Sequence, residues 1–170
     1  MNQVAGPCRS TIDEVDIMIN GRDYRDIVFI QDITGSQQAF IDKARDEIQN
    51  TLNGIVNSGK IASGKLRVAV VIFRDHTPED TFLTGKLDFT TDIDDVKQYL
   101  NNQIATAGGD GPEGQCCALS DALELLLTSE DDTTKIAILT TDSPPHGIGE
   151  PGDKIPDGCP FRKDHQLVIV

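Results

Sequence analysis

Three aspartates in this sequence each stand at or just beyond the end of an apolar run. The runs cover residues 27–30, 66–73 and 135–139, and the aspartates that follow them are Asp32, Asp75 and Asp142. Uninterrupted runs of this kind predict strands buried on both faces, as in a parallel sheet. The carboxyl ends of parallel strands lie at one edge of the sheet, so we expect the three carboxylates to gather there. Carboxylates crowded in a partly desolvated cleft repel one another, and a divalent cation would relieve that repulsion.

Hydroxyl groups close to Asp32 strengthen the interpretation of this edge as a metal site. The pattern is Asp32-x-Thr34-x-Ser36, placed between an expected strand and an expected helix. Its spacing can direct one carboxylate and two hydroxyls to a single point, a ligand set that suits Mg²⁺, Mn²⁺ or Ca²⁺. Taken alone, each aspartate could instead cap a helix and face water.

A second loop, rich in glycine, adds two acids to the candidate site. Residues 108–114 read Gly-Gly-Asp-Gly-Pro-Glu-Gly and contain Asp110 and Glu113 just before an expected helix. The same residues would also suit a helix start, with Asp110 as the N-cap and Pro112 in the first turn. The two interpretations are compatible, so both acids remain candidates for metal binding.

The two patterns resemble the metal-ion-dependent adhesion site of von Willebrand factor A (VWA) domains and integrin I domains. Asp32-x-Thr34-x-Ser36 is similar to the family's Asp-x-Ser-x-Ser, with Thr34 keeping the hydroxyl. The glycine-rich loop is similar to the integrin β form, Asp-x-Pro-Glu-Gly. That likeness implies Glu113 as a ligand, and Asp110 as a ligand of the same or a neighbouring cation.

Two further residues enter through this resemblance. Asp142 matches the aspartate that ends a strand and completes the family's site, often through water. If the threonine form of the second motif applies, the candidate is Thr106 in place of Glu113. Runs at 73–76, 142–147 and 156–160 (Phe-Arg-Asp-His, Asp-Ser-Pro-Pro-His-Gly and Pro-Asp-Gly-Cys-Pro) resemble hemicentin-like and α-kinase-associated VWA domains.

The resemblance implies a binding module and not an enzyme. Asp32, Thr34, Ser36, Glu113 and Asp142 would hold Mg²⁺, or else Mn²⁺ or Ca²⁺, directly or through water. A protein ligand that presents an acidic residue would complete the coordination. Two alternatives stay open: a metal-assisted hydrolase or phosphotransferase, and a structural VWA domain with an empty site.

The remaining pattern predicts an α/β fold, with a doubly wound, mostly parallel open sheet that is flanked by helices and has one antiparallel edge strand. Helices are expected over about 37–57, from Asp92 to 101, and after residue 114. The last helix should turn Ala118, Leu119, Ala122, Leu123 and Leu126 inward. The edge strand is expected over 81–89, a long loop over 143–163 and a further strand from 166 to 170.

The predicted organisation is a polar arm over residues 1–24 followed by one domain over 25–170. Members of the VWA family have a further helix, a last strand and a closing helix after the long loop. The resemblance therefore implies a domain that is incomplete at its C-terminus.

Charge and hydropathy exclude several classes of partner. The formal net charge of −13 disfavours nucleic acids and anionic membrane surfaces. No apolar run reaches the roughly 18–20 residues that span a bilayer, so we expect no membrane insertion. No signal peptide is visible, which predicts a cytoplasmic protein, or an extracellular one if the N-terminus is incomplete.

The cysteines and histidines do not form a recognisable catalytic or zinc-binding motif. Cys8, Cys116, Cys117 and Cys159 form no Cys-x-x-Cys pair, so we expect free, partly buried thiols and no zinc site. His76, His146 and His165 could act as bases, but no Gly-x-Ser-x-Gly, His-Glu-x-x-His or P-loop pattern accompanies them. His146, which follows two prolines, is expected to fix a loop or to lie at the surface.

Overall fold

The apolar run that follows Tyr24 forms the central strand β1 (Arg25–Asp32), and all its residues are buried. The computed structural model describes residues 24–39, 41–59, 61 and 64–160. In this part of the chain four strands lie in the order β3-β2-β1-β4. The strands β2 (Leu66–Phe73) and β4 (Thr134–Thr140) pair with β1 in parallel, and β3 (Thr84–Thr90) runs antiparallel to β2 at an edge. The predicted α/β fold with an antiparallel edge strand is confirmed.

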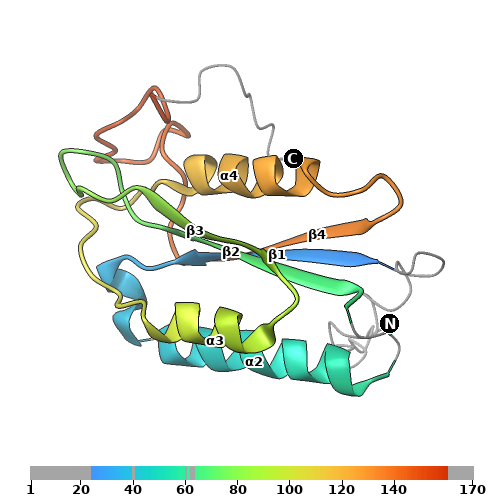
Figure 1. Ribbon diagram of the computed structural model, residues 1–170. Helices are drawn as coiled ribbons and strands as arrows, with labels where there is room; N and C mark the ends of the chain where they lie inside the picture. Colours follow the sequence, from blue (N-terminus) through green and yellow to red (C-terminus); the bar gives the residue numbers. More distant parts are fainter. Residues whose placement is uncertain (1–23, 40, 60, 62–63, 161–170) are drawn as a thin grey trace, which may run out of the picture.

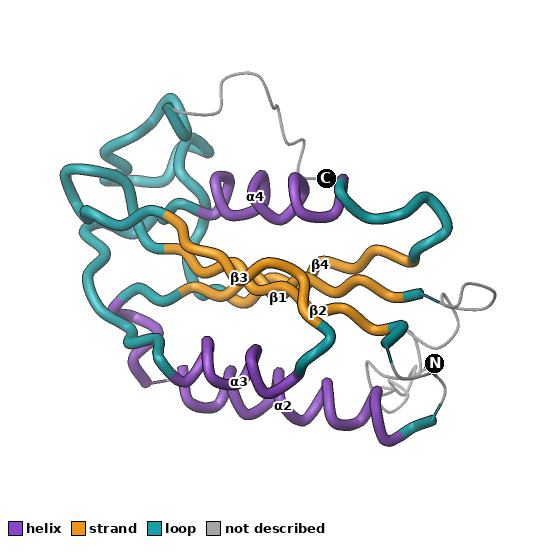
Figure 2. Tube along the Cα trace, in the orientation of Figure 1, coloured by secondary structure: helices purple, strands orange, loops and turns teal. Residues whose placement is uncertain are grey.

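Helices cover both faces of the sheet (Figures 1 and 2). The short 3₁₀ helix η1 (Gly35–Ala39) precedes α2 (Ile41–Asn57), which lies with α3 (Ile93–Asn101) on one face. The opposite face carries α4 (Gln115–Leu127). Asp92 caps α3 as expected, since its side chain accepts a hydrogen bond from the Asp94 amide.

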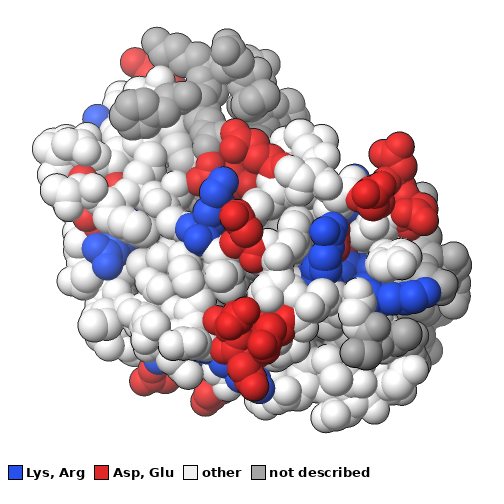
Figure 3. Space-filling view, in the orientation of Figure 1, with Lys and Arg blue, Asp and Glu red and all other residues white. Residues whose placement is uncertain are grey.

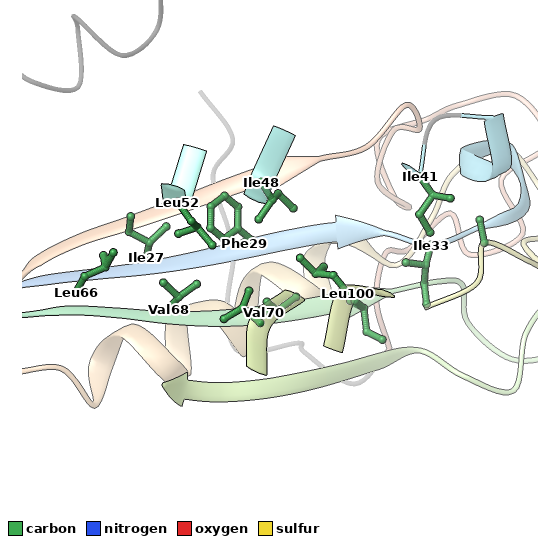
Figure 4. Close-up of a cluster of buried hydrophobic side chains, with 13 residues drawn as sticks. Ile27, Phe29, Ile33, Ile41, Ile48, Leu52, Leu66, Val68, Val70 and Leu100 are labelled. Atoms are coloured by element: carbon green, nitrogen blue, oxygen red, sulfur yellow. The ribbon is translucent and has the colours of Figure 1, made fainter. Parts of the chain in front are cut away.

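The alternation of side chains along β1 divides the core into two layers. Ile27 and Phe29 pack with Ile48 and Leu52 of α2 on one side of the sheet, as Figure 4 shows. Val28 and Ile30 face the opposite side, where they meet the α4 residues Ala118, Ala122 and Leu125. Because the side chains of a strand alternate between its faces, this central run must be apolar at every position.

Three sequence predictions need correction. The strand β4 is not buried along its length, and Ile138 and Leu139 are 37% and 39% exposed. In the described part of the chain β4 pairs with β1 alone, which leaves its other side uncovered. Leu123 of α4 is exposed and Leu125 takes the inward position. The predicted helix from residue 37 begins as η1, and only continues as an α-helix from Ile41.

Some predicted elements fall outside the described residues. These are the N-terminal arm, except for Tyr24, and the strand expected over 166–170. Among the helices that the structure describes, none is both long and apolar enough to cross a bilayer.

Candidate metal centre

The carboxyl ends of β1, β2 and β4 lie at one edge of the sheet, and the loops that follow them gather at the left of Figure 1. The register places Asp32 opposite Phe73 of β2, and Gln31 opposite Thr140 of β4. Asp75 lies two residues after Phe73, and Asp142 lies two residues after Thr140. The predicted convergence of the strand-end aspartates at one edge is therefore found.

Asp32 is fully buried and is held by the hydroxyls around it. Its Oδ1 accepts hydrogen bonds from the amide and the hydroxyl of Thr34, at 2.8 and 2.7 Å. Its Oδ2 accepts one from Thr141 Oγ1 at 2.7 Å. The Asx-type turn at Thr34 gives the chain its sharp exit from β1, so the same carboxylate shapes the turn and faces the site.

A chain of hydroxyls connects Asp32 with Asp142. Thr34 Oγ1 lies 3.2 Å from Ser36 Oγ, and Ser36 donates to Asp142 Oδ1 at 3.0 Å. Burial acts to raise the pKa of Asp142, but hydrogen bonds from Gln37, Ser36 and Ser143 outweigh it and lower the pKa. Ser36 and Asp142 are both exposed, so this end of the network opens to solvent.

Glu113 is brought to the same edge by its backbone. Its amide donates to Pro144 O at 3.0 Å, and the Gly114 amide donates to Arg74 O at 3.0 Å. The loop thus lies between the chain that leaves β2 and the chain that leaves β4. The helix α4 starts only after Gly114, so the alternative role of Asp110 as its N-cap is wrong.

The Glu113 carboxylate lies in an unfavourable electrostatic environment. Glu113 is 3% exposed, and its Oε2 has no hydrogen-bond partner among the described residues. Burial, followed by the charges of Asp75, Asp32, Asp110 and Asp142, raises the pKa of Glu113 to about 9. Without a cation the group therefore keeps its proton at neutral pH.

Gly108 makes the room that this carboxylate occupies. A Cβ at Gly108 would come within 2.8 Å of Glu113 Oε1 and within 3.2 Å of Thr34 Cβ, and its φ of +83° also favours glycine. Thr106, the alternative ligand, lies in the same loop, and its amide donates to Ile33 O at 3.1 Å. The Thr106 side chain is exposed.

Sequence reasoning missed a second network beside this one. His146 lies between two carboxylates, with Nε2 2.7 Å from Asp75 Oδ1 and Nδ1 2.8 Å from Asp153 Oδ1. Burial lowers the pKa of His146, but the hydrogen bonds and charges of the two aspartates outweigh it and leave the pKa raised. Asp153 also accepts hydrogen bonds from the amides of Gly147 and Ile155, at 2.8 Å each. His146 therefore fixes the loop, and the alternative of a surface histidine is wrong.

Asp110 belongs with this second network. Its carboxylate, that of Asp75 and the ring of His146 offer ligand atoms that all lie within 4.8 Å of one another. One oxygen of Asp110 accepts a hydrogen bond from the Lys154 amide at 2.8 Å. Asp32, Glu113 and Asp142 do not form a group of this kind in the described residues. They are linked through the hydroxyls of Thr34 and Ser36 or through their charges.

The oxidation state of the cysteines differs from the one that the sequence predicts. Cys117 and Cys159 form a disulfide across 42 residues, while Cys116 is free, and Cys8 lies outside the described residues. The expectation of free thiols is wrong for the first two because the loop over 143–160 folds back over the start of α4. His76 is 1% exposed and lies beside the disulfide, with Nε2 3.7 Å from Cys117 Sγ. Burial, and then the nearby His146, lower the pKa of His76 and favour the neutral ring.

Charged side chains on the face seen in Figure 3 are mixed, with Lys and Arg lying among Asp and Glu. Among the described residues, this face has no extended basic patch of the kind that binds a phosphate backbone.

Comparisons with known proteins give distant likenesses. No family model matches the chain. It is 26% identical over 121 residues to the putative ariadne-like RING finger protein R811 of Acanthamoeba polyphaga mimivirus, a match that covers 71% of this chain and 11% of that protein.

Solved structures of the pilus adhesin SpaC from Lactobacillus rhamnosus GG share the fold. The open conformation has a TM-score of 0.58 at 19% identity and matches 72% of this chain. A second SpaC crystal structure has a TM-score of 0.56 at 18% identity and matches 74%. The chain spans 15% and 16% of these adhesin chains.

Proposed function

We propose that this chain is a VWA-type domain that binds a partner protein through a divalent cation at the carboxyl edge of its sheet. The observation that carries the proposal is the carboxylate of Glu113. It lacks a hydrogen-bond partner at Oε2 in the described structure, and its burial, followed by the charges of four aspartates, raises its pKa. Such a concentration of acids is unfavourable by itself and is explained by a cation that these groups are built to hold.

The donors present fit Mg²⁺, Mn²⁺ or Ca²⁺. Carboxylate and hydroxyl oxygens are the ligands of hard cations, and the network offers both types. Asp32, Thr34, Ser36, Glu113 and Asp142 are the residues proposed to hold the ion directly or through water. Asp110 would serve a neighbouring position with Asp75, since ligand atoms of the two carboxylates lie within 4.8 Å of one another.

A partner would reach the ion through the exposed side of the network, where Ser36 and Asp142 lie. When bound, the cation would supply a positive charge and a coordination position for a partner's carboxylate. The loop over 143–160 and the turn after β2 lie at this same end of the sheet in Figure 1 and would set specificity. The fold shared with a pilus adhesin agrees with a binding role, although that likeness concerns the fold alone.

A catalytic role has less support. Both ring nitrogens of His146 are within hydrogen-bond distance of carboxylates, and the side chain is 2% exposed. A histidine held in this way is not available to activate a metal-bound water. A hydrolase or phosphotransferase is therefore not proposed.

Calorimetric titration with Mg²⁺ and Mn²⁺ tests the proposal. We expect saturable binding by the parent chain, and no saturation by Asp32→Asn at the metal concentrations that saturate the parent. The matched control is Asp88→Asn, which removes the same charge from an exposed position in β3 and should bind normally. Binding of acetate to the Mn²⁺-loaded protein, followed by electron paramagnetic resonance, then tests the open position. A parent chain that binds neither metal would contradict the proposal and favour a purely structural domain.

A further inference from the structure

Three side chains with sulfur or nitrogen donors meet outside the acidic network, which comprises Asp32, Thr34, Ser36, Glu113 and Asp142. His76 follows β2, Cys117 lies in the first turn of α4, and Cys159 lies near the end of the loop over 143–160. Their ligand atoms all lie within 4.8 Å of one another. His76 and Cys117 are buried and Cys159 is half-buried, so the group is set into the protein and keeps a route to solvent.

The spacing within this group suits a small tetrahedral ion. Zinc binds sulfur at about 2.3 Å and imidazole nitrogen at about 2.0–2.1 Å, so two such ligands of one ion lie about 3.6 Å apart. The distance from Cys117 Sγ to His76 Nε2 is 3.7 Å. Two sulfur ligands of one zinc ion lie about 3.8 Å apart. Opening of the disulfide would allow Cys159 Sγ to move out to that separation from Cys117 Sγ.

We propose that His76, Cys117 and Cys159 form a Zn²⁺ site when the disulfide is reduced. The disulfide and the metal ion are then alternative cross-links between the loop over 143–160 and α4. Water completes the coordination on the side of Cys159. Either cross-link holds the end of the loop over 143–160 against the start of α4. The protein would thus keep this loop in place under both oxidising and reducing conditions.

The chemistry of the exchange balances with a dithiol, or with a phosphine and one water molecule, because the phosphine takes the oxygen of the water to become a phosphine oxide and the two protons of the water go to the sulfurs. A dithiol gives up two electrons and two protons, becomes a cyclic disulfide, and converts the bond between Cys117 and Cys159 into two thiols. Zn²⁺ then displaces one proton from each thiol into solvent. Two thiolates and a neutral imidazole bind the ion, and the charges of the ion and the thiolates cancel.

The choice of metal follows from the donor atoms. Thiolate and imidazole select zinc over magnesium, whereas the carboxylates and hydroxyls around Asp32 select magnesium, manganese or calcium. Cys116 adjoins Cys117 in the sequence but is absent from the group, because neighbouring residues of a helix point in different directions. It provides a matched control.

Cobalt titration tests the proposal on the intact chain, with Asp32→Asn as the background so that the acidic site does not interfere. The protein is reduced with a phosphine, freed of it without oxygen, and titrated with Co²⁺. We expect one equivalent of Co²⁺ to give thiolate-to-cobalt charge-transfer absorption. Zn²⁺ added afterwards should displace Co²⁺ and remove this absorption. Cys117→Ser and Cys159→Ser should abolish the absorption, His76→Asn should weaken binding about 10-fold or more, and Cys116→Ser should change it little.

A second measurement covers variants that fail to fold. The reduced parent chain is alkylated with and without Zn²⁺, and the protected cysteines are identified by peptide mapping. Protection of Cys117 and Cys159, but not of Cys116, supports the proposal. It is overturned if the reduced parent shows no charge-transfer absorption, or if Zn²⁺ leaves both cysteines as reactive as before. Neither outcome bears on Mg²⁺ binding at Asp32, so the two proposals can fail separately.

Discussion

Asp75 and His76 are neighbours in the sequence, yet their side chains belong to two regions of different chemistry. Asp75 accepts a hydrogen bond from His146 and adds its charge to the acidic network around Glu113. His76 lies beside Cys117 and the disulfide. One turn after β2 therefore supplies oxygen donors to one region and a nitrogen donor to the other. The Asp75 carboxylate, which suits a hard cation, and the His76 imidazole, which suits zinc, are therefore separated by a single peptide bond in the chain.

The two regions also differ in how the chain assembles them. In the acidic network, Asp32, Thr34 and Ser36 come from one continuous stretch. The second region joins His76 to Cys117, 41 positions apart, and Cys117 to Cys159, 42 positions apart. It depends on the loop over 143–160 folding back over α4. A contiguous motif is visible in a sequence, whereas a cluster closed by long-range packing is not.

The largest effect is expected for Asp32→Asn. This change keeps the shape of a buried side chain that accepts three hydrogen bonds, but removes its charge. A unit charge close to a divalent ion is worth several kcal/mol at an effective dielectric constant near 20. We expect the affinity for Mg²⁺ to fall about 1000-fold, or roughly 4 kcal/mol, by calorimetry. Zn²⁺ binding by the reduced chain should not change, and loss of both metals together would show that the regions are not independent.

Removal of the disulfide should have the next largest effect. In the oxidised chain without zinc, Cys159→Ser should lower the free energy of unfolding by about 3 kcal/mol in urea, because the bond closes a loop of 42 residues. Cys116→Ser, one residue from the disulfide, should change it by less than about 1 kcal/mol. Equal effects of the two substitutions would mean that the stabilisation comes from packing and not from the cross-link.

Glu113→Gln should stabilise the metal-free protein by about 1–3 kcal/mol at pH 7. The folded chain holds the Glu113 proton up to a pKa of about 9, whereas the unfolded chain releases it near the ordinary value of 4.5. Stability therefore falls as the pH rises between these values, and the substitution should remove much of that slope.

Urea unfolding at several pH values, compared between the parent and Glu113→Gln, isolates this contribution. The comparison is needed because the raised pKa of His146 also makes stability fall with rising pH. Parallel pH profiles for the two proteins would indicate that Glu113 is already ionised in the folded chain. With Mg²⁺ present the order should reverse, because the substitution then removes a ligand.

The smallest effect is expected for Thr106→Val. The Thr106 side chain is exposed and its backbone amide, which the substitution keeps, makes the contact with Ile33. We expect the Mg²⁺ affinity to change by less than about threefold, or roughly 0.6 kcal/mol. A loss as large as that of Asp32→Asn would make Thr106 the second-motif ligand and would remove Glu113 from that role.

The sequence was informative where a local pattern sufficed. The apolar run of β2 predicts both of its bounds, and the spacing of Asp32, Thr34 and Ser36 predicts the turn after β1. The burial of β4 could not be predicted this way, since an apolar run does not tell which strands lie beside it. Asp153 gave no signal, because its role depends on the loop folding around its carboxylate. The pairing of Cys117 with Cys159 depends on the same loop.

The anchoring of the loop over 143–160 has a consequence for the kinetics of association. Besides the disulfide, the Lys154 ammonium lies 2.7 Å from Glu79, and Pro145 bridges to Glu113. A surface secured at several points loses little conformational entropy when a partner docks on it. Any complex formed here should therefore assemble in a single step, without a slow ordering phase. Differences in affinity among partners should then appear mainly in the rate at which they leave.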